Sequence, residues 1–198
     1  AVGRLAREFP WLRIRPIHAD FSRPLHIAAA GSRQKRVVYF PGSTIGNLSR
    51  DEAQAFLSMT LGQAARMLVG VDLKKDANVL HAAYNDSRGV TAAFNLNLLA
   101  RINRELRADF DLKTFSHYAF YNAPRGRIEM HLVSLKRQTV RVGAHRYRFG
   151  VGESIHTENS YKYAVEDFHA LAARAGFSAP KLWTDAKGLF ALHGLKAR

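Results

Sequence analysis

A short polar segment late in the chain contains side chains that could bind a small heterocycle. Within residues 152–160, Glu158 and Ser160 stand two positions apart. On an extended backbone, alternate side chains point the same way, so this carboxylate and this hydroxyl would face one edge of a ligand. An imidazole ring has nitrogens on two sides and suits such a pair. Alternatively, Ser160 caps a helix that follows it and Glu158 is solvated, and the spacing leaves both interpretations open.

A second candidate side chain, Asn47, follows a short apolar segment at residues 36–40. Between them the sequence breaks into a Pro-Gly pair and then Ile-Gly-Asn, which is typical of a buried strand followed by a turn. In open α/β sheets, ligands bind outside the carboxyl ends of the strands, where glycines let the backbone approach closely. We therefore expect Asn47 at the rim of a binding site.

A third candidate is the pair Asp20 and Phe21. It follows residues 12–17, in which apolar and basic side chains alternate as they do in a strand. A carboxylate at the end of a strand can accept a hydrogen bond from an adenine amino group or a ribose hydroxyl, and an adjacent aromatic ring can cover a base. The alternative is that Asp20 forms a turn and Phe21 belongs to the core.

The sequence contains none of the common motifs for metal binding or covalent catalysis. Its nine histidines form neither a His-x-x-x-His nor a His-Glu-x-x-His pattern, so we expect no metal site. Cysteine is absent, which excludes disulfides, thiolate ligands and cysteine nucleophiles. There is no Gly-x-Ser-x-Gly elbow, and the Gly-Ser-Thr turn that begins at Gly42 lacks the lysine of a phosphate-binding loop. We therefore expect neither acyl transfer nor nucleotide hydrolysis.

The chain is strongly basic, with 30 Lys+Arg against 16 Asp+Glu in 198 residues and a formal charge of +14. Such a charge favours polyanions as partners. The basic residues are spread over most of the chain, however, without a long Lys/Arg block or an RNP-type aromatic motif, so we expect no nucleic-acid-binding surface. No apolar segment approaches the roughly 18 residues that a membrane span needs, so we expect no membrane partner.

The elements around these candidates predict an α/β fold. Residues 36–40 and 67–73 have the continuous apolar character of buried parallel strands. Between them, Ser49 and Glu52 have the spacing of a capping box, which predicts the start of a helix. This order of strand, helix and strand favours a doubly wound, Rossmann-like parallel sheet.

The middle of the chain has a different pattern. Residues 78–84 and 91–106 predict helices. Short segments with alternating apolar residues follow at 115–121, 128–135, 139–142 and 147–151. These segments predict an antiparallel meander, and an antiparallel section after parallel units suggests an inserted subdomain that selects the substrate.

The last part of the chain returns to the first pattern. Residues 162–175 predict a helix, and residues 181–185 and 189–195 predict a hairpin that adds an antiparallel edge to the sheet. The expected organisation is therefore a sheet domain at 1–75, an inserted substrate-recognition subdomain at 76–160, and a return to the sheet domain at 161–198.

Six motifs together carry a resemblance that covers essentially the whole chain. In order, they are FPGSTIGN at 40–47, VDLKKD at 71–76, AYND at 83–86, GVTAAFN at 89–95, RIEMHL at 127–132 and TENSYK at 157–162. The chain resembles the histidine-specific, S-adenosylmethionine-dependent methyltransferases of ergothioneine biosynthesis. The resemblance implies a Rossmann-like class I methyltransferase sheet with an inserted α+β subdomain, and transfer of three methyl groups to the α-amino nitrogen of L-histidine, which gives hercynine.

The resemblance also implies roles for individual residues. Asn47 and Tyr84 would hold the carboxylate end of the amino acid, and Glu158 and Ser160 would bind its imidazole. The rest of the histidine pocket would be lined by Gly42, Thr44, Thr91, Phe94 and Met130. Asp20 and Phe21 would contact the adenine of S-adenosyl-L-methionine, the only cofactor that the resemblance implies.

Some of the family's features lie outside this sequence. The chain starts at Ala1, without Met and within a helical pattern, so we expect that an N-terminal portion is missing. The family's glycine-rich cofactor loop, the acidic residue after it and a substrate-site tyrosine would lie there, and we expect this piece alone to bind the cofactor incompletely. Asn85 replaces a common Asp, and Asn159 replaces a common β-branched apolar residue.

The resemblance predicts a monomeric, cytoplasmic enzyme with L-histidine as its small-molecule partner. Two alternatives stay open. One is a related methyltransferase that acts on another amine or on RNA, which the charge of +14 motivates. The other is a non-catalytic fragment of the family.

Overall fold

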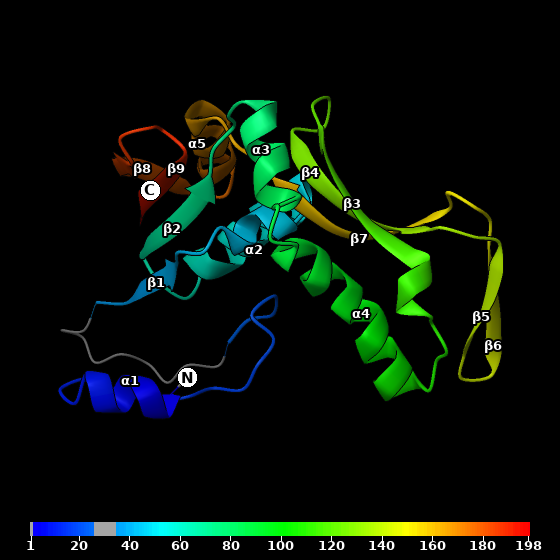
Figure 1. Ribbon diagram of the computed structural model, residues 1–198. Helices are drawn as coiled ribbons and strands as arrows, with labels where there is room; N and C mark the ends of the chain where they lie inside the picture. The colour runs from blue at the N-terminus through cyan, green and yellow to red at the C-terminus, as the bar shows by residue number, and fades with distance from the viewer. Residues whose placement is uncertain (1, 26–34) are drawn as a thin grey trace.

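The computed structural model describes residues 2–25 and 35–198, which form an α/β fold (Figure 1). The elements in this part of the chain are, in order, α1 (Val2–Glu8), β1 (Val37–Phe40), the 3-10 helix η1 (Thr44–Asn47), α2 (Arg50–Leu61), β2 (Arg66–Asp72), α3 (Ala77–Tyr84), α4 (Val90–Leu106), η2 (Leu112–Thr114), β3 (Phe115–Asn122), β4 (Arg127–Ser134), β5 (Gln138–Val142), β6 (His145–Phe149), β7 (Ser154–Tyr161), α5 (Val165–Arg174), β8 (Phe177–Thr184) and β9 (Phe190–Ala197). Among the helices so described, none combines the length and the hydropathy that crossing a membrane requires.

A first sheet has four strands in the order β1-β2-β9-β8, so it combines the first two strands of the chain with the last two. β1 and β2 are parallel, as predicted, whereas β9 is antiparallel to both β2 and β8. The predicted terminal hairpin is confirmed, and it extends the sheet beyond β2 through the antiparallel strand β9. The edge strand itself, β8, differs from the expectation, because it runs parallel to β1 and β2. β9 is central because its alternate residues Ala191, His193 and Leu195 are buried.

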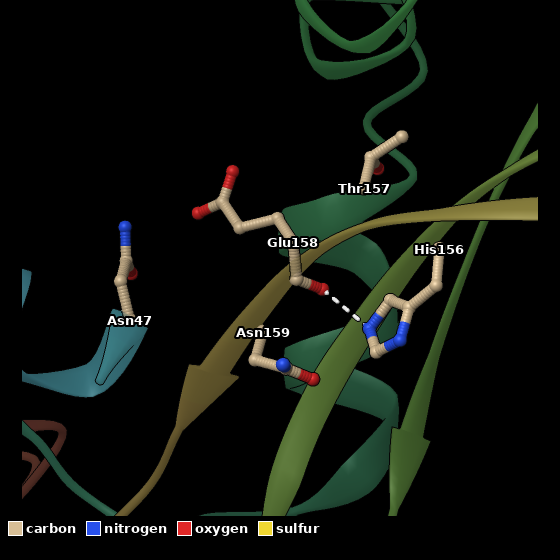
Figure 2. A pocket seen from close by; sticks show the side chains of 5 residues that line it. All are labelled: Asn47, His156, Thr157, Glu158 and Asn159. Atoms are coloured by element: carbon tan, nitrogen blue, oxygen red, sulfur yellow. Dashed lines mark hydrogen bonds between the residues drawn. The ribbon is translucent and has the colours of Figure 1, made fainter. Parts of the chain in front are cut away.

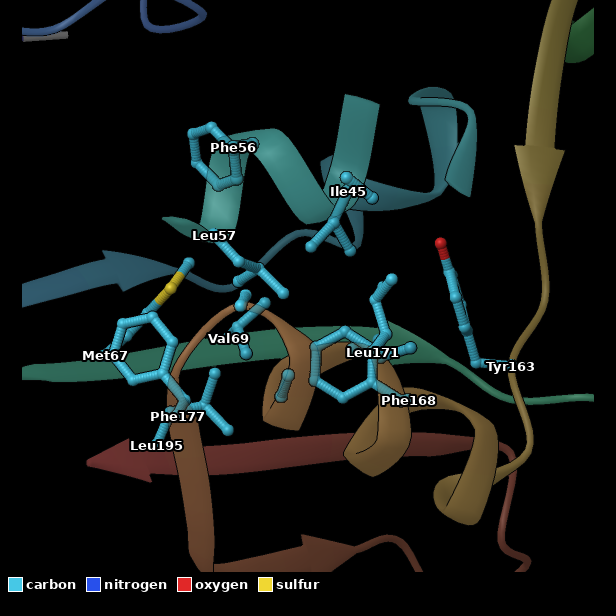
Figure 3. Close-up of a cluster of buried hydrophobic side chains, with 14 of the residues drawn as sticks. Ile45, Phe56, Leu57, Met67, Val69, Tyr163, Phe168, Leu171, Phe177 and Leu195 are labelled. Atoms are coloured by element: carbon cyan, nitrogen blue, oxygen red, sulfur yellow. The ribbon is translucent and has the colours of Figure 1, made fainter. Parts of the chain in front are cut away.

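Helices α2 and α5 pack on one face of this sheet and enclose the main hydrophobic core (Figure 3). Phe56 and Leu57 of α2 and Phe168 of α5 contact the buried side chains of β2. Burying a side chain of this size contributes about 1.5–3 kcal/mol. The predicted capping box of α2 is confirmed, since Ser49 Oγ accepts a hydrogen bond from the Glu52 backbone and the Glu52 carboxylate accepts one from the Ser49 backbone.

The turn after β1 lies against the backbone of β2. A Cβ atom at Gly70 would be 1.8 Å from the carbonyl oxygen of Pro41, so only glycine allows this close approach. The next residues of the turn are tied to the same strand, since the backbone N–H of Asp72 donates to Ser43 Oγ at 2.9 Å. These contacts fix η1, and with it Asn47, beside the carboxyl end of β2.

A second sheet has the antiparallel order β3-β4-β7, and α3 and α4 pack against β3 on one of its faces. The predicted four-strand meander is wrong in one respect, because β5 and β6 form a separate hairpin and β7 takes the place beside β4. β5 does not pair with β4, and its residue Val140 is instead buried in a cluster with Leu99 of α4 and with Phe110. Figure 1 shows the β5–β6 hairpin beyond the end of the second sheet.

Two predicted boundaries also need correction. Residues 12–17 form no strand, because no described strand pairs with their backbone and Leu12 and Ile17 are exposed. The last helix begins at Val165 rather than near residue 162, because β7 continues to Tyr161. The domain boundaries expected at 75 and 160 stay predictions.

Candidate functional site

The edge strand β7 places Glu158 and Ser160 on the same face of the second sheet. Glu158 pairs with Met130 of β4 and Ser160 pairs with Ile128. Met130 and Ile128 are both buried beneath α3 with Leu80, and directly paired residues share a face. The alternative in which Ser160 caps the following helix is wrong, since the N-cap position of that helix is occupied by residue 164.

A β-bulge separates this pair from the first half of β7. The register shifts so that His131 pairs with His156 and Met130 pairs with Glu158, which leaves Thr157 as the extra residue. The hydroxyl of Thr157 donates to the carbonyl oxygen of Met130 at 3.0 Å. Bulges of this kind re-aim side chains beside active sites. Here His156 faces away from the helices, whereas Glu158 faces them.

Asn47 and Glu158 line one cavity of about 390 Å³, together with His156, Thr157 and Asn159. Figure 2 shows the Asn47 amide and the Glu158 carboxylate reaching toward each other from η1 and β7. A histidine molecule fits in this volume. The structure thus brings together the two residues that the sequence analysis assigned to opposite ends of the ligand.

The environment of Glu158 changes its acidity. Burial raises the pKa of this carboxyl above its ordinary value, and attraction to the Lys162 ammonium and hydrogen bonding with Asn47 act in the opposite direction. A partly buried carboxylate beside an amide is a strong hydrogen-bond acceptor for a ring N–H.

Ser160 belongs to a buried polar network that continues to the first sheet. Tyr84 Oη donates to Ser160 Oγ at 2.8 Å, and the ammonium of Lys162 donates to both of these oxygens at 2.8 Å. Lys162 also pairs with Asp72 at the end of β2, with 2.6 Å between Nζ and Oδ2. Asp72 forms a second ion pair with Lys75. Tyr84 therefore contacts Ser160 directly, although the sequence analysis placed these residues at different ends of the ligand.

The loop that carries Asn47 needs a glycine before it. Gly46 is buried, and a Cβ atom there would be 2.9 Å from the carbonyl oxygen of Tyr161 in β7. Real Cβ contacts are longer than this, so the absence of a side chain lets η1 pack directly on β7. This contact sets the separation of Asn47 from Glu158.

Apart from Asn47 and Glu158, the predicted substrate residues, including Ser160 and Tyr84, lie outside the lining of this cavity in the described part of the chain. Thr44 is in η1, just after Gly42. Thr91 lies in the first turn of α4, where its backbone N–H donates to Asp86. Hydrogen bonds from the backbone and the hydroxyl of Thr91 and from the backbone of Val90 lower the pKa of Asp86 to about 2.

Phe94 and Met130 have opposite surroundings. The Phe94 side chain on α4 is 61% exposed, whereas that of Met130 is buried directly beside Glu158 in the sheet. The pocket roles of Gly42, Thr44, Thr91, Phe94 and Met130 stay predictions.

The predicted adenine contacts lie near the carboxyl end of β1. The ring of Phe21 is 5.6 Å from that of Phe40, the last residue of β1, and it remains partly exposed. Asp20 accepts hydrogen bonds from the backbone and hydroxyl of Ser22, and these bonds lower its pKa. An exposed carboxylate beside an aromatic face at a strand end fits an adenine nucleoside.

Sequence reasoning missed three residues of the site. Lys162 could have been noticed as a lysine between two tyrosines, Tyr161 and Tyr163, in an otherwise apolar stretch. Asn159 lines the cavity, and its buried Oδ1 has no hydrogen-bond partner within residues 2–25 and 35–198. His156 lines the cavity as well, and its position depends on a bulge that no sequence motif indicates.

One group of side chains contains metal-ligating atoms within 4.8 Å of one another, namely those of Glu129, His131 and His156. The rings of His131 and His156 stack 4.6 Å apart at 12°, so their in-plane lone pairs run side by side and do not converge on one ion. Glu129 is already paired with Arg127 at 2.7 Å. In this arrangement the three side chains contact one another and Arg127 on the sheet, and their geometry does not suit a metal ion.

Comparisons with known proteins show the family of the chain. Residues 1–197 match the family described as histidine-specific methyltransferase, SAM-dependent. The histidine N-alpha-methyltransferases of Mycolicibacterium smegmatis and Mycobacterium tuberculosis are both 42% identical to this chain, over 97% and 95% of it. Ergothioneine biosynthesis protein 1 of Neurospora crassa is 31% identical over 77% of this chain and 18% of its own length.

The chain spans 61% and 60% of the length of the two bacterial relatives. The family match itself covers nearly every residue of the chain. The chain belongs to the family of histidine-specific, S-adenosylmethionine-dependent methyltransferases.

Proposed function

We propose that this chain belongs to an enzyme that methylates the α-amino group of L-histidine three times and gives hercynine, in ergothioneine biosynthesis. One observation supports this proposal most strongly: Asn47 and Glu158, from two distant parts of the sequence, line the same cavity. A free amino acid has a polar group at each end, so a cavity with an amide donor on one side and a carboxylate on the other matches it.

The imidazole end of the substrate belongs at β7. Glu158 offers an acceptor for a ring N–H, and Ser160 on the same face offers a hydroxyl for the second ring nitrogen. A site built to hydrogen-bond both nitrogens rejects amino acids without them, because its own buried polar groups would then be left unpaired. This recognition gives specificity for histidine over apolar amino acids.

The amine end must be aligned with the methyl donor. S-adenosylmethionine supplies a methyl group on a positively charged sulfur, and Asp20 and Phe21 would hold its adenine. The protein needs to hold the histidine nitrogen unprotonated and in line with that methyl group, which is a matter of positioning more than of acid–base strength. Asn47, fixed by the Gly46 contact with β7, would hold the carboxylate next to that nitrogen.

The test is methyl transfer by the full-length protein, with isotopically labelled S-adenosylmethionine and mass spectrometry of the products. We expect mono-, di- and trimethylated histidine from L-histidine, and loss of all three in Glu158→Ala. The matched control is Glu105→Gln, which removes an exposed glutamate on α4. Equal methylation of other amino acids would contradict the proposal, and transfer to RNA with a steep salt dependence, without transfer to histidine, would select the RNA alternative.

The cytoplasmic location and the monomeric state stay predictions of this proposal. Gel filtration of the full-length protein at several concentrations checks the second of them.

A further inference from the structure

The ammonium of Lys162 is enclosed on all sides by the protein. Its side chain is 0% exposed, and its Nζ lies 2.6 Å from Asp72 Oδ2, 2.8 Å from Tyr84 Oη and 2.8 Å from Ser160 Oγ. The same nitrogen lies 4.8 Å from the centre of the Tyr84 ring. An ammonium group has three N–H donors and no acceptor, so three acceptors satisfy it completely.

This arrangement restricts what the Ser160 hydroxyl can do. Ser160 Oγ accepts one hydrogen bond from Lys162 and one from Tyr84 Oη. A phenol is a better donor than an aliphatic hydroxyl, which favours this direction for the bond between the two hydroxyls. Both lone pairs of Ser160 Oγ are then occupied. The proton of Ser160 is the one hydrogen-bonding function that remains, and no acceptor within residues 2–25 and 35–198 takes it.

We propose that Lys162 is a positioning residue that fixes Ser160 as a hydrogen-bond donor toward the substrate. The inference rests on the proposed function, because it concerns how the protein recognises the imidazole ring by hydrogen bonds. Glu158 on the same face acts as the acceptor, so the pair binds a ring with one N–H and one bare nitrogen. The site therefore selects neutral imidazole in a single tautomer and rejects a ring without an acceptor nitrogen.

Lys162 is suited to this task because it only donates. A water molecule in the place of its ammonium could also accept, and Ser160 could then turn its proton away from the ligand. The Asp72 carboxylate pairs with the buried ammonium, and this pair connects the network around Ser160 to the end of β2 in the first sheet.

The test compares ligands by calorimetry on the full-length protein. The probes are L-histidine and the two pyrrolylalanine isomers, 3-(pyrrol-2-yl)-L-alanine and 3-(pyrrol-3-yl)-L-alanine, which retain a ring N–H but have CH in place of the acceptor nitrogen. With wild-type protein, the tighter pyrrole should bind about tenfold to a hundredfold more weakly than L-histidine, because it leaves the buried Ser160 donor unpaired.

In Lys162→Ala, water can fill the space of the ammonium, so this preference for L-histidine should fall by about threefold or more. The double variant Asp72→Asn/Lys162→Ala removes both charges and tests the same point if the single variant folds poorly. Lys74→Ala, which breaks an exposed ion pair with Asp167 nearby, is the matched control and should keep the wild-type preference. The ratio of the dissociation constants of two ligands for one protein does not change when the affinities for both ligands fall equally.

The outcomes separate the two proposals. If wild-type protein binds no L-histidine, the proposed function is wrong. If wild-type protein prefers L-histidine and the folded Lys162 variants keep that preference in full, or if wild-type protein binds a pyrrole as tightly as L-histidine, the role of Lys162 is overturned while histidine binding stands.

Discussion

Lys162 Nζ lies 2.6 Å from Asp72 Oδ2, and this ion pair joins the end of the parallel strand β2 to the residue that follows β7. The Lys162 side chain is fully buried, and that of Asp72 is 21% exposed. Tyr163, next to Lys162, donates its backbone N–H to the carbonyl oxygen of Asp72 at 3.2 Å. The two sheets are therefore connected through the same residues that organise the Ser160 hydroxyl.

Removing the carboxylate of this pair should destabilise the fold. In Asp72→Ala the buried Lys162 ammonium loses its counter-ion, and we expect the free energy of unfolding to fall by about 3 kcal/mol. Urea unfolding of the full-length protein measures it. Asp167→Ala breaks the exposed pair with Lys74 and should cost no more than about 1 kcal/mol. Equal effects of the two substitutions would show that the burial of Lys162 is unimportant.

A side chain at residue 46 should move Asn47. The Cβ atom of Gly46→Ala would meet the Tyr161 carbonyl oxygen at 2.9 Å, so η1 must shift away from β7. We expect about tenfold weaker binding of L-histidine, which corresponds to about 1.4 kcal/mol. Gly62→Ala is the control, because a Cβ atom there would lie 3.5 Å from the Met59 carbonyl oxygen, which is an ordinary contact distance. Unchanged affinity in Gly46→Ala would contradict the role given to this contact.

The buried His193 should make the fold sensitive to acid. Burial, with a smaller contribution from His169, lowers the pKa of His193 to about 4. The unfolded chain binds this proton near pH 6.5, whereas the folded chain binds it only near pH 4. The free energy of unfolding should therefore be highest above pH 6.5 and should fall by about 3 kcal/mol as the pH is lowered from 6.5 to 4.

Denaturant unfolding at a series of pH values checks this expectation. His193→Leu should show a flatter dependence on pH, whereas His145→Leu on the exposed hairpin strand β6 should behave as wild type. An identical slope in wild type and His193→Leu would rule out His193 as the source of the acid sensitivity.

The sequence was sufficient for the local features of the site. The capping box at Ser49 and Glu52, the parallel pairing of β1 with β2 and the common face of Glu158 and Ser160 all follow from patterns of a few residues. These features depend on backbone geometry within one element or between neighbouring elements. Local periodicity describes such geometry well.

Long-range pairing was harder to predict. The position of β9 inside the sheet and the separation of the β5–β6 hairpin depend on which faces are buried in the complete fold. The network around Lys162 joins Asp72, Tyr84 and Ser160, which are far apart in the sequence. The bulge at Thr157 also brings His156 into the cavity lining without a sequence signal.

The most direct test of the account is calorimetry of L-histidine and histamine on full-length wild type, Asn47→Ala and Glu158→Ala. Histamine keeps the imidazole but lacks the carboxylate. We predict that Asn47→Ala weakens L-histidine binding by about tenfold or more and leaves histamine within about threefold of wild type, whereas Glu158→Ala weakens both. If Asn47→Ala weakens both ligands equally, or neither, the cavity does not hold one amino acid by its two ends.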